Sequence, residues 1–280
     1  NTGNIKAANN SVGIYAVSYQ DPLNPNTSFG NGTINITNNG TITAINSEKT
    51  TGIYSNNNKA GALRTTGTVD LGTGTIDVSL SKNGTGVYTE NNTVSGGGSI
   101  SVGENGVGIY SKNSDLNLTN MTLNLNGNNS LGIFVNGSGT AYNQSLVKVN
   151  GNSSIGMLIN NGTGSNLGLD GVSTNYTRGD ALIETTGSNS HGVILTKLNS
   201  ALNTVFTNTG HIKNNSEETI GIYAEKGAVF THNFMGTTSG AQTAEINSGN
   251  GAIGIYVKDV GTVGNIGAPI ITGDSTTKTS

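Results

Sequence analysis

The 280-residue chain contains no cysteine, no tryptophan and only 3 prolines, and charged residues make up only 10% of it. Without cysteine there are no disulfides, thiolate metal sites or cysteine nucleophiles. The scarcity of proline excludes a collagen-like chain. The formal net charge of −3 offers no basic surface for nucleic acid or for an anionic membrane. No apolar run approaches the roughly 18 residues of a membrane span, so we expect neither a nucleic-acid partner nor membrane insertion.

The chain is instead rich in glycine, asparagine, threonine and serine, which together exceed half of its residues. A unit of glycine, an apolar residue and usually an aromatic residue recurs nine times, at 13–15, 52–54, 86–88, 108–110, 132–134, 156–158, 192–194, 221–223 and 254–256. A short alternating strand begins 8 to 10 residues before each of the last eight glycines. The other arm of the repeat varies from 14 to 29 residues.

This pattern predicts an all-β solenoid. Short strands with one apolar face cannot bury that face alone, but stacked coils of such strands enclose a continuous core. We therefore predict one parallel β-helix over residues 1–280, with about 9–12 rungs and loops extruded from the variable arm. Residues 1–272 are expected to form rungs. Residues 273–280 contain no apolar side chain and are expected to be a linker between rungs of a longer protein.

Period two also predicts which side chains face inward. The residues one before, one after and three after each repeated glycine are expected inside, with the glycine and the aromatic residue outside. The alternative places the aromatic residues inside. The expected inner stack is Val12, Ile14, Ile53, Val87, Ile109, Ile133, Met157, Val193, Ile222 and Ile255. The expected outer ladder is Tyr15, Tyr54, Tyr88, Tyr110, Phe134, Tyr223 and Tyr256, at about 4.8 Å per rung.

These residues carry a family resemblance. The repeated Gly-Ile-Tyr unit and the Gly-Thr-Ile strands at 40–42 and 74–76 resemble the passengers of large fusobacterial autotransporter adhesins. The resemblance covers nearly the whole chain and identifies a group rather than one member. It implies a right-handed β-helix displayed on the bacterial surface and anchored in the outer membrane through a barrel that this segment lacks. The implied function is attachment to host cells or partner bacteria, by a segment that we expect to be monomeric unless its open ends associate.

The polar residues give little sign of catalysis. Polysaccharide-cleaving β-helices need clustered acids, whereas the 16 acidic residues are scattered and Glu217–Glu218 is the only adjacent pair. Stacking could still bring acids such as Asp77 and Glu104 together, so such an enzyme remains an alternative. His191, His211 and His232 lack metal-ligand spacing. We therefore expect no enzymatic activity, no cofactor and no bound metal.

The variable arm supplies the candidate binding residues. A partner, whether a host cell-surface protein or glycan or the surface of another bacterium, is expected to contact its longer loops, because they can vary without disturbing the strands. One alternative is that a single loop forms a specific receptor- or glycan-binding site. Another is that Phe230 and Phe234 pack against the solenoid. The candidates are Tyr19, Phe29, Arg178, Gly179, Asp180, Phe230 and Phe234, of which residues 178–180 match the integrin-binding tripeptide.

Overall fold

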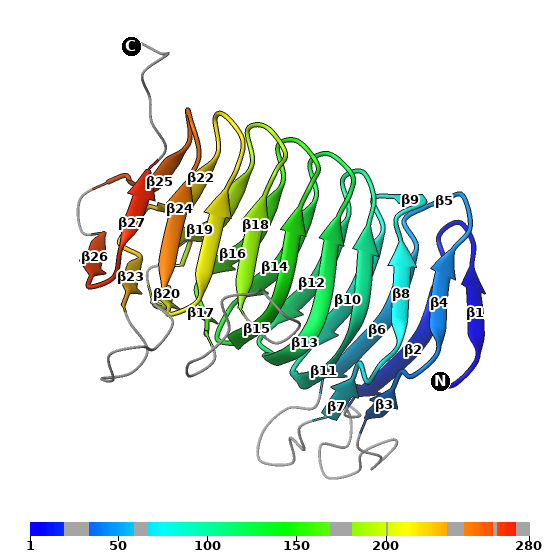
Figure 1. Ribbon diagram of the computed structural model, residues 1–280. Helices are drawn as coiled ribbons and strands as arrows, with labels where there is room; N and C mark the ends of the chain where they lie inside the picture. The colour runs from blue at the N-terminus through cyan, green and yellow to red at the C-terminus, as the bar shows by residue number, and fades with distance from the viewer. Residues whose placement is uncertain are drawn as a thin grey trace.

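The computed structural model describes residues 1–19, 34–58, 67–168, 181–199, 201–233, 244–259 and 262–272. These residues form a right-handed parallel β-helix, as expected for the fold class (Figure 1). No helix occurs in the described ranges, and hence none that could cross a membrane. The expected linker at 273–280 lies outside the described residues.

A complete rung contributes one segment to each of three faces. The first face carries the repeated glycine units in nine strands, which agrees with the lower end of the expected rung number. Its strands are β2 (Val12–Tyr19), β6 (Thr51–Asn58), β10 (Thr85–Glu90), β12 (Val107–Lys112), β14 (Leu131–Asn136), β16 (Ile155–Asn160), β19 (His191–Thr196), β22 (Ile220–Ala224) and β25 (Ile253–Val257).

The second and third faces belong to one 16-stranded sheet, because three long strands run through the corner between them. These long strands are β11 (Asn92–Val102), β13 (Asp115–Leu125) and β15 (Thr140–Val149). The second face also contains β3 (Asn35–Thr37), β7 (Gly67–Asp70), β17 (Thr163–Asn166), β20 (Val205–Asn208), β23 (Val229–His232) and β26 (Val263–Ile266). The third also contains β1 (Asn4–Ala7), β4 (Thr41–Ala44), β8 (Thr75–Val78), β18 (Leu182–Thr185), β21 (His211–Asn214), β24 (Glu245–Ser248) and β27 (Ile270–Thr272).

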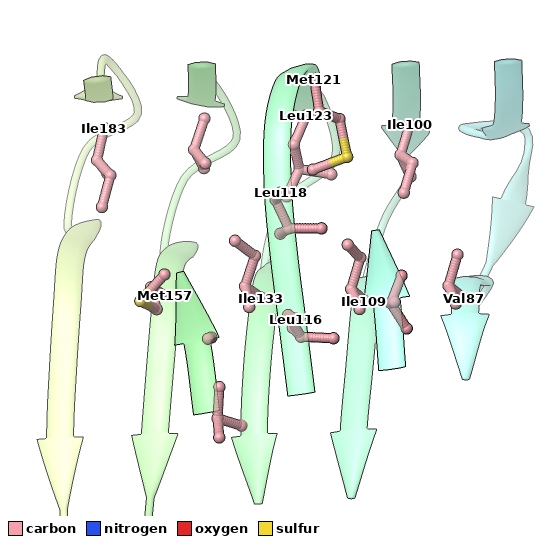
Figure 2. Packing of buried hydrophobic residues seen from close by; sticks show 14 of the residues in the cluster. Val87, Ile100, Ile109, Leu116, Leu118, Met121, Leu123, Ile133, Met157 and Ile183 are labelled. Carbon is pink, nitrogen blue, oxygen red and sulfur yellow. The ribbon is translucent and has the colours of Figure 1, made fainter. Parts of the chain in front are cut away.

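The core is a set of stacked apolar columns that run along the solenoid axis. Parallel pairing keeps equivalent residues in register, so that Val87 lies opposite Ile109 and Ile100 opposite Leu123. Figure 2 shows the first-face column and the third-face column pointing toward each other between the sheets. Ile109 and Leu123 are fully buried. Each rung therefore buries its apolar face only because its neighbours cover it.

The corner between the third and first faces, hereafter the fixed corner, repeats one tight turn in every rung. Each turn contains a residue in the left-handed region, usually asparagine, which tolerates that conformation. The amide of this residue donates to a carbonyl of the next turn, as from Asn105 to Asn128 and from Asn129 to Asn152, both at 2.9 Å. In the first two rungs the strands β5 (Ser47–Glu48) and β9 (Ser81–Lys82) also pair here. An inserted residue would break these bonds on both sides.

A buried ladder of serine hydroxyls reinforces the fixed corner. The amide of Ser130 donates to Oγ of Ser154, and the amide of Ser154 donates to Oγ of Ser190, both at 3.0 Å. The Ser190 hydroxyl in turn donates to the carbonyl of Gly151 at 2.9 Å. These contacts satisfy buried backbone groups that the turn would otherwise leave unpaired.

All the longer insertions leave from the other two corners, hereafter the variable corners. Segments 20–34 and 59–66 join the first face to the second, whereas segments 167–181 and 233–244 join the second face to the third. The expected variable arm is thus the whole second face with a corner at each end. In Figure 1 the fixed corners line the upper edge of the solenoid.

The inner side of the first face differs from the prediction at the residue before each glycine. Val12 is 39% exposed, and its counterparts Val107 and Leu131 are half-buried rather than buried. The reason is that alternation breaks at the glycine. A Cβ at Gly86 would lie 2.5 Å from the carbonyl oxygen of Gly108 and 2.7 Å from Ile100 Cγ2, so this position faces inward against neighbouring atoms.

The remaining inner positions follow the prediction except at the last rung, where Val257, three residues after the glycine, is 46% exposed. The first-face residues from Ile53 to Ile222 that follow the glycine are buried, whereas Ile14 and Ile255, near the two ends, are partly buried against the same core. The aromatic residues lie outside, as expected. The glycine therefore does not share the outer face with the aromatic residue; it is needed where the first-face strand approaches a third-face isoleucine.

Buried polar side chains form a second ladder where the second face ends. Asn143 Nδ2 donates to Asn166 Oδ1 at 2.9 Å, and Asn166 Nδ2 donates to Asn208 Oδ1 at 2.8 Å. Asn208 Nδ2 lies 3.0 Å from Nδ1 of His232, and His232 Nε2 lies 3.0 Å from the carbonyl oxygen of Pro269. Since that carbonyl can only accept, His232 Nε2 donates to it, and Nδ1 faces the Asn208 amide.

Candidate binding surfaces

The structure describes only part of the predicted loop site. Tyr19 is the last residue of β2, and Phe29, Arg178, Gly179, Asp180 and Phe234 lie outside the described residues. Phe230 is described and is 1% exposed, so in this structure it is a core residue and the packing alternative holds for it.

Two glycines explain the burial of Phe230. Phe206 and Phe230 lie opposite each other on the second face, at the position that Gly164 and Gly264 occupy in the flanking rungs. A Cβ at Gly264 would lie 2.5 Å from Phe230 Cζ. At this position, two rungs carry a phenylalanine ring and the rungs on either side carry glycine. The missing side chains leave room for both rings inside the solenoid.

The described surface with the most regular chemistry is the outside of the first face. Three columns of side chains run along it, formed by the residues one before, two after and four after each repeated glycine. The leading column is Val12, Thr51, Thr85, Val107, Leu131, Ile155, His191, Ile220 and Ile253; the aromatic column is Tyr15, Tyr54, Tyr88, Tyr110, Phe134, Leu158, Ile194, Tyr223 and Tyr256; the polar column is Val17, Asn56, Glu90, Lys112, Asn136, Asn160, Thr196, Glu225 and Lys258.

The aromatic column stacks as predicted. Ring centroids are 5.2 Å apart from Tyr15 to Tyr54, 4.7 Å from Tyr54 to Tyr88 and 5.2 Å from Tyr88 to Tyr110, with nearly parallel planes. Because each inner ring is covered on both faces by its neighbours, only ring edges and hydroxyls meet the solvent along the stack. The column thus offers a ridge of edges, not a platform for a flat sugar ring.

The leading column lies on this same outer side. His191 of the leading column makes an edge contact with Tyr223 of the aromatic column, with centroids 6.1 Å apart. Burial lowers the pKa of His191 below its usual value. Two neighbouring columns that are largely apolar therefore run together over the nine rungs.

The first charge cluster of the polar column lies over β10 and β12. Glu90 accepts a hydrogen bond from the Tyr88 hydroxyl at 3.1 Å and pairs with Lys112 at 2.9 Å. Burial, followed by the effect of Glu90, raises the pKa of Tyr88 well above its usual value. The hydrogen bond to Glu90 and its charge raise the pKa of Lys112. Both effects keep Tyr88 neutral and Lys112 charged around neutral pH.

A second cluster repeats this chemistry over β22 and β25. Glu225 accepts from the Tyr223 hydroxyl at 3.0 Å and from Thr196 at 3.1 Å, and it pairs with Lys258 at 3.8 Å and with Lys226 at 3.6 Å. Burial alone would raise the pKa of Glu225, but these hydrogen bonds and positive charges lower it below its usual value. Burial and the hydrogen bond to Glu225 also raise the pKa of Tyr223.

The acids and histidines singled out from the sequence have separate partners. Asp77 accepts from Ser79 at 3.0 Å, whereas Glu104 pairs with Lys82 at 3.2 Å across the fixed corner. His232 is held in the asparagine ladder. Among the described residues, no three His, Asp or Glu side chains are placed to hold one metal ion.

Comparison with protein-family models, with curated proteins and with solved structures found no match.

Sequence reasoning missed the two charge clusters and the leading column. Tyr88–Glu90 and Tyr223–Glu225 share a Tyr-x-Glu spacing, and each is followed in the next rung by a Tyr-x-Lys unit, at Tyr110 and Tyr256. That recurrence was a readable signal, because parallel stacking puts equivalent positions side by side. The outward leading column had no such signal, since strict alternation placed it inside.

Proposed function

We propose that this chain is a surface-displayed passenger segment of an autotransporter adhesin, which presents attachment loops to host cells or partner bacteria. The observation that supports this most directly is the unequal treatment of the corners. The fixed corner repeats the same bonded turn, whereas the variable corners accept segments of different length and even shifts of register, as between Gly96 and Gly98, while the strands on either side stay paired. A rigid rod with variable loops suits display of recognition segments away from a cell.

The proposed partner is a host cell-surface protein or glycan, or a component of another bacterium's surface. The proposed contact residues are Tyr19, Phe29 and Phe234 together with Arg178-Gly179-Asp180, all at or within segments that leave from the variable corners. Outer-membrane anchoring through a barrel elsewhere in the protein is part of the same proposal and comes from the family resemblance.

The test is binding of the purified chain to host cells, partner bacteria and a glycan array. Segments 20–33, 169–180 and 234–243 are replaced one at a time by short Gly-Ser linkers, and the exposed fixed-corner variant Glu104→Gln serves as the control. Phe230 is left in place because it is buried. Loss of binding in at least one loop variant, with full binding by Glu104→Gln, would support the proposal. Binding that all three replacements leave intact would contradict it.

A separate variant addresses the tripeptide. Asp180→Glu keeps the charge but lengthens the side chain, which an integrin-type contact would not tolerate. Cell attachment that this variant leaves unchanged would remove residues 178–180 from the proposed contacts, while the loop replacements would still test the other two segments.

A further inference from the structure

We propose that the outer first face is a self-complementary surface that binds a second copy of this chain in antiparallel orientation. The proposal goes beyond attachment to other cells and does not depend on it, because it rests only on the columns and their charges. It replaces the expectation of a monomer.

The first step is the chemistry of the surface. From β10 to β25, the leading column contributes mainly Val, Leu and Ile, and the aromatic column contributes Tyr, Phe, Leu and Ile. Nothing in the described part of the chain packs over these side chains from outside as another layer. Sheets of this kind stack face to face at about 10 Å when side chains of both faces are apolar.

The second step is the order of charges in the polar column. Glu90 and Lys112 lie on β10 and β12, and Glu225 and Lys258 directly follow β22 and β25, with β16 midway between the two pairs. The carboxylates are 14% and 16% exposed, whereas Lys112 and Lys258 are 44% and 53% exposed. At two strands from β16, Lys112 on one side matches Glu225 on the other. At three strands from β16, Glu90 matches Lys258. Charges at equal distances from β16 therefore have opposite signs.

The third step is the symmetry that matches this order. A two-fold axis along the strand direction at β16 keeps each column opposite its own copy and reverses the rungs, so that β10 faces β25 and β12 faces β22 of the other molecule. Glu90 then lies opposite Lys258 of the second copy, and Lys112 opposite its Glu225. With the intrachain pairs, Glu90 and Lys112 of one copy and Glu225 and Lys258 of the other alternate in sign around a square, and Lys226 adds a further positive charge beside Glu225.

The other face-to-face symmetry fails. A two-fold axis along the solenoid would place the polar column opposite the leading column, and Glu90 and Lys112 would be covered by apolar side chains without new partners, which is costly. The antiparallel arrangement also places Leu158 of β16 opposite its own copy at the axis.

The fourth step is size. The paired surface runs from β10 to β25, about 34 Å at the rung spacing, and spans about 17 Å across the strands. Two such surfaces bury about 1,100 Å² in total, which is the size of weak or transient protein interfaces. We therefore expect a reversible dimer rather than an obligate one.

The test uses two half-swap variants of the whole chain. The first, Glu90→Lys with Lys112→Glu, keeps the intrachain pair but puts like charges opposite both partners in the dimer. The second, Glu225→Lys with Lys258→Glu, does the same from the other end, although Lys226 loses its own pair with Glu225 in this variant. Sedimentation velocity up to about 100 μM should show a dimer for the unmodified chain and at least a tenfold weaker dimer for each half-swap. Circular dichroism checks that both variants fold.

Mixing provides the decisive readout. Half-swap molecules of the two kinds restore every opposite-sign pair in a heterodimer, so their mixture should dimerise like the unmodified chain. A monomeric unmodified chain would overturn the proposal. So would a dimer that both half-swaps preserve, because association would then run through the ends of the solenoid. Either result leaves the loop-binding tests of the proposed function unaffected.

Discussion

The fixed corner and the variable corners of this solenoid handle the same problem, a sharp change of chain direction, in opposite ways. At the fixed corner, each turn bonds to the turns before and after it, as Asn129 does with Asn152 and Ser130 with Ser154. At the variable corners, tight turns such as that at Asn113 alternate with connections of very different length. The comparison teaches that stacking tolerates variation where turn-to-turn bonding is dispensable and excludes it where that bonding is continuous.

The largest expected difference between the two kinds of corner is in their tolerance of inserted residues. A Gly-Ser-Gly-Ser segment between Gly127 and Asn128 should remove about four turn hydrogen bonds and destabilise the chain by about 3–6 kcal/mol. The same segment between Ala201 and Leu202, at a variable corner, disturbs only a local turn and should cost less than about 1 kcal/mol. Denaturant unfolding of both variants measures the difference. Equal losses would mean that the corners do not differ in this respect.

The first-face strand β12 joins a fixed corner to a variable corner, and its inward side chains should contribute to stability more than its outward ones. Ile109, on the inward side, tests this. Ile109→Ala removes a fully buried side chain from the first-face column and should destabilise the chain by about 2–5 kcal/mol. Val107→Ala, on the outer side of the same strand, should cost about 1 kcal/mol or less. Similar losses for the two variants in thermal or denaturant unfolding would mean that the inner and outer sides are wrongly assigned.

Just after the fixed corner, the repeated glycine lies very close to the backbone of the next rung. We therefore predict that a side chain at this position destabilises the chain. Gly108→Ala would place a Cβ 2.6 Å from both the Gly132 carbonyl oxygen and Leu123 Cδ1, so the strand would have to shift at a cost of about 1–3 kcal/mol. Gly3→Ala meets no atom within 4 Å and is the matched control. The two melting temperatures should separate clearly, and a Gly108→Ala chain as stable as Gly3→Ala would be evidence against the crowding argument.

The serine ladder sharpens the comparison further. Ser154→Ala leaves the buried amide of Ser130 without its acceptor and should destabilise the chain by about 1–3 kcal/mol. Ser138→Ala at a variable corner removes only an exposed hydroxyl, which lies 3.3 Å from Asn113 Oδ1, and should change stability by about 0.5 kcal/mol or less. Hydrogen exchange should also show faster exchange at Ser130 in the first variant only.

The smallest expected effect is a pH dependence through His191, the first residue after the fixed corner in its rung. Burial lowers its pKa in the folded chain below the usual 6.5. The unfolded chain therefore takes up the proton first, and the stabilising contribution is present above about pH 6.5 and lost as the pH falls below it. Melting curves from about pH 8 to about pH 5 should fall less steeply for His191→Thr than for the unmodified chain.

Much of this architecture was predictable because repeats stack. The constant spacing before each glycine predicted the fixed corner, and the stacked tyrosines from Tyr15 to Tyr110 followed from register alone. The failure at Val12 came from a local break in alternation, which depends on how close Gly13 approaches the next rung. The burial of Phe230 was not predictable because its environment is set by Gly264, which lies in the next rung and is distant in sequence.

The asparagine ladder from Asn143 to His232 has one sense throughout, since every amide in it donates toward the later rung. Its members are buried, and the first of them, Asn143 Oδ1, has no hydrogen-bond partner in the described residues. A single amide cannot reverse, because donor would then meet donor on one side and acceptor meet acceptor on the other. The row therefore takes one orientation as a unit. The Pro269 carbonyl, which can only accept, sets the orientation of the Asn143 amide four rungs earlier.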